Sequence, residues 1–295
     1  MAARPEALHE AVLDWYAEQA RDLPWRRPGT SPWGVLVSEV MLQQTPVERV
    51  RPLWQEWLAR WPEPPGLAGE PAGEAVRAWG RLGYPRRALR LHAAATQIST
   101  GHGGQVPSSY DALRALPGVG DYTASAVLTF AFGARHVVLD TNVRRVLARL
   151  LHAQPAAPAY QRVSERASAA ALLPGPQQAP VWSVALMELG ALVCTPRRPG
   201  CAVCPVRDWC AWRLAGQPAA ARPERRRQPW AGTDRQARGR LLAVLRDRPA
   251  ATPAVSQAEL DLAWPDPVQR ERALRSLVAD GLVEALGGQR WGLPR

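Results

Sequence analysis

Residues 111–133, DALRALPGVGDYTASAVLTFAFG, hold a short helical pattern, a turn with two glycines and a longer apolar helical pattern. The first helix is expected to end at Leu116, and residues 117–120 (PGVG) form the turn. Glycine lets two backbones approach closely and leaves the N–H groups of the next helix free to face an anion. The segment predicts a helix–hairpin–helix that binds phosphate through Gly118 and Gly120; an ordinary turn between two helices is the alternative.

The chain around this segment is also helical in pattern, with almost no strand alternation before residue 240. Ser31 before Pro32 and Thr45 before Pro46 are typical of helix starts. Helices are expected over residues 5–20, from 32, from 46 to 60, and over 73–81, 85–99, 108–115 and much of 160–193. The body of the protein is therefore expected to be mainly α.

The composition indicates a globular protein with a polyanionic partner. The chain has 295 residues, 46% of them hydrophobic, and a formal net charge of +11. That length allows two domains, and that charge favours nucleic acid, although a merely solvated basic surface is the alternative. The N-terminus shows no signal-peptide pattern and no apolar run approaches a membrane span. We expect a soluble, cytoplasmic, nucleoid-associated monomer that binds no membrane.

All 37 basic residues are arginine, because the sequence contains no lysine. A lysine amine is the usual protein group that forms a Schiff base with a sugar aldehyde. Side-chain imine chemistry is therefore excluded for this chain.

All four cysteines lie in one stretch, CTPRRPGCAVCPVRDWC, from Cys194 through Cys201 and Cys204 to Cys210. A disulfide pattern is disfavoured in a cytoplasmic protein. Four thiolates suit structural zinc or a cubane iron–sulfur cluster. Zinc sites more often have two close cysteine pairs, and Pro205 after Cys204 slightly favours the [4Fe–4S] cluster.

Arg197 and Arg198 lie in the loop between the first two cysteines. A cluster that pinned this loop would present both side chains as a rigid basic group for phosphate contact. Two solvated arginines are the alternative.

The last part of the chain has a different pattern. Residues 215–232 are rich in proline, alanine and arginine, which is typical of a linker. Three short helical patterns and a hairpin at Gly287-Gly288 follow. This order resembles a winged helix, and Arg270, Arg272 and Arg275 on its third helix would add salt-sensitive contacts with DNA phosphate.

The order of the motifs resembles a known family. LPGVG, the later aspartate in VVLDTNV and the cysteine spacing are similar to the endonuclease III superfamily of DNA glycosylases. Within it LPW, SEVMLQQT, LGY and ELGALVCTPRRP resemble the MutY family of adenine DNA glycosylases. The resemblance covers about residues 8–213. It implies excision of adenine that is mispaired with 8-oxoguanine or guanine in double-stranded DNA and flipped into a pocket.

The resemblance also implies a fold of two helical lobes that hold DNA between them. A six-helix lobe, 26–139, carries the helix–hairpin–helix at about 108–132. The iron–sulfur lobe combines 1–25 with 140–213. A linker, 214–232, and a winged-helix-like α+β domain, 233–295, complete the expected fold.

Two carboxylates are expected to carry the chemistry. Glu39 lies in a helix between Val35, Leu36 and Leu42, so desolvation should raise its pKa. The resemblance implies that Glu39 protonates adenine as a general acid, whereas a buried glutamate paired with arginine is the alternative. It implies that Asp140 stabilises the cationic sugar; a simple helix N-cap is the alternative.

Further positions take their roles from the resemblance. Tyr122 stands where strand-cleaving relatives have lysine, which implies base excision alone. Residues that would contact adenine are Arg21, Trp25, Leu42 and Glu188, and those that would wedge into the duplex and touch the opposite base are Gln43, Gln44 and Tyr84. Core packing is the alternative for Trp25, Leu42 and Tyr84.

Two departures and two rival functions remain. Thr141 replaces a common glycine, and the tail after residue 233 is too short for the Nudix-like domain that reads 8-oxoguanine in larger members. Residues 233–295 are therefore expected to add non-specific affinity for DNA and little discrimination between 8-oxoguanine and guanine. Packing of the tail over the opposite base, or binding of a protein partner, is the alternative. A thymine-mismatch glycosylase could share Tyr122 and the cluster, but SEVMLQQT and Glu188 favour adenine. A non-catalytic DNA-binding regulator would need neither Glu39 nor Asp140.

Overall fold

The computed structural model describes residues 5–219, 230–249 and 254–295. By its internal contacts the chain divides into two compact units. Unit 1 comprises Met1–Val35, Ser108–Arg114 and Val119–Glu224, and unit 2 comprises Leu36–Pro107, Ala115–Gly118 and Arg225–Arg295. The expected lobe boundaries stay a prediction.

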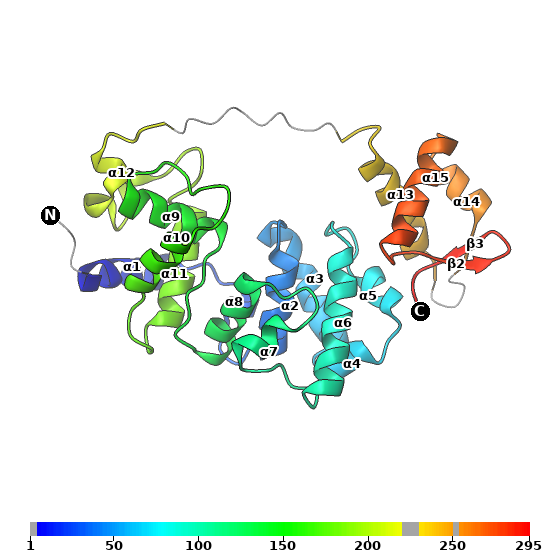
Figure 1. The fold of residues 1–295 in the computed structure, drawn as a ribbon, viewed down its shortest axis with the longest axis horizontal. Helices are drawn as coiled ribbons and strands as arrows, with labels where there is room; N and C mark the ends of the chain where they lie inside the picture. The colour runs from blue at the N-terminus through cyan, green and yellow to red at the C-terminus, as the bar shows by residue number, and fades with distance from the viewer. Residues whose placement is uncertain (1–4, 220–229, 250–253) are drawn as a thin grey trace. The chain divides into compact units, whose positions relative to one another are not determined.

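Among the described residues of unit 1, all regular elements are helices (Figure 1). Its α-helices are α1 (Pro5–Gln19), α7 (Tyr110–Arg114), α8 (Asp121–Phe132), α9 (Thr141–His152), α10 (Val163–Ala171), α11 (Ala179–Leu192) and α12 (Ala211–Leu214). Short 3-10 helices span Pro24–Arg26, Cys201–Val203 and Arg207–Trp209. α11 packs against both α1 and α9, so that Leu8, Val146 and Trp182 share one core. The helical region expected at 160–193 is two helices, because the chain turns at Pro174 and Gly175.

Helix α2 (Pro32–Leu42) begins in unit 1 and continues into unit 2. The predicted start is confirmed, because Ser31 Oγ accepts a hydrogen bond from Gly34 N at 3.1 Å and Pro32 is the first helical residue. Its composition is almost wholly apolar, so most of its side chains are buried.

Unit 2 contains α3 (Val47–Arg60), α4 (Pro64–Ala68), α5 (Ala72–Ala78) and α6 (Arg86–Gly101). α4 and α5 both pack against α6 (Figure 1). Trp57 is fully buried and makes edge contacts with Trp61 and Trp79, with ring centroids 4.7 and 5.8 Å apart. This aromatic cluster supplies much of the apolar area in the unit's core.

The C-terminal domain, residues 230–295, also belongs to unit 2. It contains α13 (Asp234–Arg246), β1 (Val255–Ser256), α14 (Gln257–Ala263), α15 (Pro267–Ala279), β2 (Glu284–Gly287) and β3 (Arg290–Gly292). The strands form an antiparallel sheet in the order β1-β3-β2, of which Figure 1 labels β2 and β3. The three expected helices and the hairpin at Gly287-Gly288 are confirmed.

The arginines expected to contact DNA from α15 already have partners. Arg270 Nε lies 2.9 Å from Asp261 Oδ1, and Arg272 binds both oxygens of Asp234. Arg275 makes a long contact of 3.7 Å with Glu271. These pairs lower the charge that α15 can offer to phosphate.

Among the described residues, no helix combines the length and the apolar character needed to cross a membrane.

Candidate active site and cluster loop

The helix–hairpin–helix turn has the geometry that its two glycines predict. Gly118 has φ of +81°, and a Cβ built on it would lie 2.8 Å from Arg90 Cβ. Gly120 is the N-cap of α8, where no other group lies within 4 Å of an added Cβ. Arg114 closes the turn by donating to Val119 O at 2.8 Å. The start of α8 thus keeps an open approach for an anion.

Tyr122 lies in the first turn of α8, directly after Asp121, and is partly buried. Tyr122, which stands where the resemblance places lysine in strand-cleaving relatives, thus lies at the N-terminal end of α8.

Helix α2 places Glu39 in an apolar environment. Its side chain is only 5% exposed, and residues before and after it on the helix, including Leu36, Val40 and Met41, are buried as well. The carboxyl group is therefore held away from bulk solvent, as the sequence predicted. Leu42 and Gln43 at the end of α2 are partly exposed, and Gln44 is exposed.

Gln44 and Tyr84, two of the residues expected to wedge into DNA, share an unusual backbone conformation. Both are non-glycine residues with positive φ, +56° and +47°. Such conformations cost about 1–3 kcal/mol each and concentrate at ligand-binding sites. Tyr84 is also 49% exposed, so core packing does not explain its aromatic ring.

A buried arginine that the sequence reasoning missed joins these two strained positions. Arg87 on α6 donates to the carbonyls of Val40, Met41 and Gln43 at 2.9, 3.1 and 2.5 Å. The same guanidinium donates to Thr45 Oγ1 and to Gly83 O. Burial lowers the pKa of Arg87 to about 10, which leaves it charged at neutral pH.

Arg87 therefore ties the C-terminal end of α2 to the turn that holds Tyr84. It also explains why Thr45 is not the N-cap of α3, since its hydroxyl binds Arg87 and the carbonyl of Gln43. Glu39, Leu42, Gln43, Gln44 and Tyr84 are thus brought together in unit 2.

A second cluster lies in unit 1 around Glu188 of α11. Glu188 is completely buried, and Arg21 donates to it from its backbone N at 3.1 Å and from Nε and Nη2 at 2.6 and 2.9 Å. Arg26, which the sequence reasoning missed, adds a contact of 2.9 Å. Burial alone would raise the pKa of Glu188, but hydrogen bonds from Arg21 and the charge of Arg26 lower it overall. Trp25, which lies between Arg21 and Arg26 in the sequence, is also buried.

Asp140 is the N-cap of α9, as its sequence position allowed. Its Oδ1 accepts from Val143 N at 2.6 Å, and its Oδ2 accepts from Asn142 Nδ2 at 2.7 Å. Desolvation raises the pKa of Asp140, while these hydrogen bonds act in the opposite direction. A carboxylate accepts about four hydrogen bonds, so these two contacts leave both oxygens of Asp140 able to interact with another positively charged group.

Gly190, two residues after Glu188, allows α11 to approach the start of α9. A Cβ built on Gly190 would lie 2.7 Å from Asn142 Cβ. Arg145 bridges the same region, since its Nη2 donates to Gly190 O and to Asn142 Oδ1 at 2.7 and 2.8 Å. This packing fixes the helix that carries Glu188 beside the cap that holds Asp140.

The loop that carries Arg197 and Arg198 is held by two arginines of α9. Arg145 donates to Cys194 O at 2.7 Å, and Arg149 donates to Thr195 O and Pro196 O at 2.8 and 3.2 Å. Arg149 is buried and stacks on Trp212 with its Cζ 4.5 Å from the ring centroid. Arg197 and Arg198 themselves are exposed.

The four cysteines form no disulfide and lie in this same part of unit 1. Desolvation raises the pKa of Cys204 to about 11, and the other three cysteines also raise it, so the four thiols influence one another electrostatically. Arg149 donates to Cys194 Sγ at 3.3 Å and Gln217 donates to Cys201 Sγ at 3.2 Å. Across the described residues, no three His, Cys, Asp or Glu side chains are arranged to hold a metal ion. The donor chemistry nevertheless fits a four-thiolate site, because a cation would offset the cost of burying these thiolates together.

Comparison with known proteins gives consistent relatives. Residues 37–170 match the profile of the HhH-GPD superfamily base excision DNA repair proteins. Adenine DNA glycosylase of Mycobacterium tuberculosis is 54% identical over 284 residues, which are 96% of this chain and 92% of that protein. A match over 96% of the chain necessarily extends into the C-terminal domain.

Thymine-DNA glycosylases are also similar to this chain. The protein of Aeropyrum pernix is 35% identical over 213 residues, which cover 71% of this chain and 95% of that one. The solved structure of a thermostable thymine-DNA glycosylase superimposes with a TM-score of 0.64 and 26% identity, covering 72% of this chain and 97% of its own.

Glu188→Gln should destabilise the folded protein by about 3–5 kcal/mol at pH 7, because it leaves Arg21 and Arg26 without their counter-charge. The pKa of Glu188 is lowered in the folded state, so its contribution is complete above the pH at which a free glutamate titrates. It is lost as the pH falls through the lower folded-state value. The difference between wild type and variant should therefore shrink below about pH 4.

Urea unfolding at pH 7 and in acid measures this difference. Glu10→Gln, an exposed residue of α1, is the control and should change stability by less than about 0.5 kcal/mol. Equal, small effects of both substitutions at pH 7 would show that the buried ion cluster does not stabilise unit 1.

Proposed function

We propose that this chain, which belongs to the adenine DNA glycosylase family of the helix–hairpin–helix superfamily, removes adenine mispaired with 8-oxoguanine or guanine. It is a DNA glycosylase of base excision repair, and DNA is its substrate. The observation that carries the finer proposal is Glu39, a carboxyl group buried at 5% exposure in α2. A buried carboxyl suits an acid that must keep a proton near neutral pH.

In this proposal Glu39 donates a proton to adenine and so makes the base a better leaving group. The bond between adenine and the sugar then breaks, and positive charge develops on the sugar. Asp140, fixed by Val143 N and Asn142, offers a negative charge that stabilises this cation until water attacks. The arrangement of one acid and one carboxylate parallels that of glycoside hydrolases.

The family motifs assign contact with adenine to Arg21, Trp25, Leu42 and Glu188. Glu188 is the least exposed of these residues, and in the proposal it also holds Arg21 in place through two hydrogen bonds from the Arg21 side chain. The opposite base and the duplex are assigned to Gln43, Gln44 and Tyr84. The positive φ of Gln44 and Tyr84 supports this role, because strain of that kind persists where a site requires it.

The enzyme is proposed to release the base without cutting the strand. Tyr122 cannot form an imine, and the chain contains no lysine that could replace it.

Cys194, Cys201, Cys204 and Cys210 are proposed to hold a [4Fe–4S] cluster. When bound, such a cluster would add a fixed link between the cysteine loop and the rest of unit 1. Arg145 and Arg149 already hold the carbonyl groups of that loop, and Gly118, Gly120, Arg197 and Arg198 would then contact the DNA backbone.

Thymine opposite guanine is the second candidate substrate, since thymine-DNA glycosylases are among the similar proteins. The higher identity to an adenine enzyme and the segment SEVMLQQT favour adenine.

The proposed function is tested with duplexes that contain one A opposite 8-oxoguanine, one A opposite G, or one T opposite G. We expect excision of adenine from the first two, and strand breaks only after alkali or heat. Preferential release of thymine would favour the second candidate. Strand cleavage without alkali, with a borohydride-trapped imine, would contradict the monofunctional mechanism.

Glu39→Gln should slow adenine excision on the order of a hundredfold or more, while binding to the mispaired duplex stays nearly unchanged. Asp140→Asn should also be severely impaired, although asparagine is a good N-cap and should preserve α9. Single-turnover rates measure the loss, and circular dichroism checks the helices. A wild-type rate for Glu39→Gln would reduce Glu39 to a structural role, and loss of helix in Asp140→Asn would do the same for Asp140.

Anaerobically purified protein should contain about four irons per chain and absorb broadly in the visible range. Changing Cys204 to serine should remove most of the iron. A colourless protein with one zinc per chain would instead assign the four thiolates to structural zinc.

A further inference from the structure

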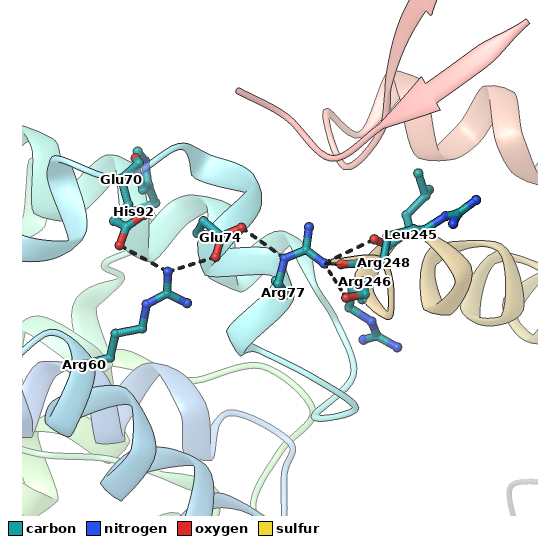
Figure 2. Close-up of polar contacts among 8 residues, drawn as sticks. All are labelled: Arg60, Glu70, Glu74, Arg77, His92, Leu245, Arg246 and Arg248. Carbon is teal, nitrogen blue, oxygen red and sulfur yellow. Dashed lines mark hydrogen bonds and ion pairs between the residues drawn. The ribbon is translucent and has the colours of Figure 1, made fainter. Parts of the chain in front are cut away.

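The C-terminal domain is attached to α5 through an arginine that binds the end of α13. Arg77 Nη1 donates to the carbonyls of Leu245, Arg246 and Arg248 (Figure 2). The last carbonyls of a helix have no partner within the helix, so a guanidinium there satisfies them and the helix dipole together. Arg246 returns the contact by donating to Gly80 O.

The guanidinium of Arg77 is itself held in place. Its Nε donates to Glu74 Oε1 at 3.0 Å, and Arg60 bridges Glu74 Oε2 and Glu70 Oε1 at 2.8 and 3.1 Å (Figure 2). The other end of the domain also lies close to α5, where Gly73 N donates to Pro294 O at 2.7 Å. A Cβ on Gly73 would lie 2.7 Å from Leu293 Cβ, so only glycine permits this approach.

This attachment brings the start of α13 to Tyr84. Arg235 Cζ lies 5.7 Å from the Tyr84 ring centroid and 5.0 Å from that of Trp230. Arg87 also lies close to Tyr84, with its Cζ 5.6 Å from the same ring centroid and 5.1 Å from that of Trp79. All four separations are within the range of cation–π attraction.

These five residues form a ladder of alternating rings and guanidinium groups from the core to the surface. It runs in the order Trp79, Arg87, Tyr84, Arg235, Trp230. Trp79 is fully buried and Trp230 is 53% exposed. Its middle residue, Tyr84, is one of the residues that the family motifs assign to the opposite base.

We propose that Arg235, at the start of α13, is a positioning residue for Tyr84 and so affects the preference for the base opposite adenine, contrary to the expectation that this domain adds little discrimination. The inference rests on the proposed function. A strained, half-exposed tyrosine keeps one orientation only if its surroundings hold it, and the exposed Arg235 lies within cation–π distance of its ring. The ion pairs of Arg270 and Arg272 within the domain fit this role better than a general grip on phosphate.

The test measures single-turnover excision of adenine opposite 8-oxoguanine and opposite guanine, with the full-length chain at two salt concentrations. Arg235→Ala should lower the ratio of the two rates by about three- to tenfold, as expected for loss of one cation–π contact. Arg240→Ala is the matched control, because Arg240 is exposed on the same helix and the substitution removes the same charge. It should change only the salt dependence of binding.

Arg235→Lys should recover part of the ratio, since an ammonium group also binds a ring face but stacks less well. Arg77→Ala should lower the ratio as Arg235→Ala does and should speed hydrogen exchange in residues 241–246. Equal ratios for Arg235→Ala and Arg240→Ala would overturn the inference. A wild-type protein that excised no adenine opposite either base would instead overturn the proposed function, and the inference with it.

Discussion

The contact on which unit 2 most depends is the one between Arg87 and the end of α2. The carbonyls of Val40 and Met41 belong to the last turn of a helix, where no backbone N–H is left to bind them. Burying them unpaired would cost about 1–3 kcal/mol each. One planar guanidinium satisfies several at once and still reaches Gly83, so α2 and the turn before α6 cannot move independently. Glu39 and Tyr84, which lie at the two ends of this arrangement, inherit their positions from it.

The two strained backbone positions in this region, Gln44 and Tyr84, both lie next to carbonyls that Arg87 binds. Gln44 and Tyr84 follow the segments that Arg87 holds, and each adopts a backbone conformation that a non-glycine residue avoids. A flexible loop would relax out of such conformations. Gln44 and Tyr84 keep these conformations because Arg87 binds the carbonyls of Gln43 and Gly83 just before them, and because Arg87 itself packs on the buried Trp79.

The helices, the burial of Glu39 and the N-cap position of Asp140 could be predicted from the sequence because their signals are local. Pro32 after Ser31 fixes the start of α2, and the apolar period around Glu39 predicts its burial. The roles of Arg26, Arg87 and Arg149 could not be predicted, because each depends on carbonyl or carboxylate partners far away in the chain. A sequence with 37 arginines offers no local mark that separates a buried arginine from a solvated one. Thr45 was misassigned as an N-cap for the same reason, since its partner Arg87 lies 42 residues away.

Several arginines donate hydrogen bonds to backbone carbonyls at the ends of helices, and this affects how the net charge is interpreted. Arg87 binds the end of α2, Arg77 the end of α13, and Arg135 the carbonyls of Leu173 and Pro174 after α10. Arg145 and Arg149 treat the end of α11 and the cysteine loop in the same way. Lysine, with a single ammonium, could not span two or three carbonyls so well. A formal charge of +11 therefore overstates what the protein offers to DNA, because part of it is committed to its own backbone. Arg197 and Arg198 are exposed, and in the proposed function they would contact the DNA backbone, where phosphate contacts fix the orientation of a duplex without reading its sequence.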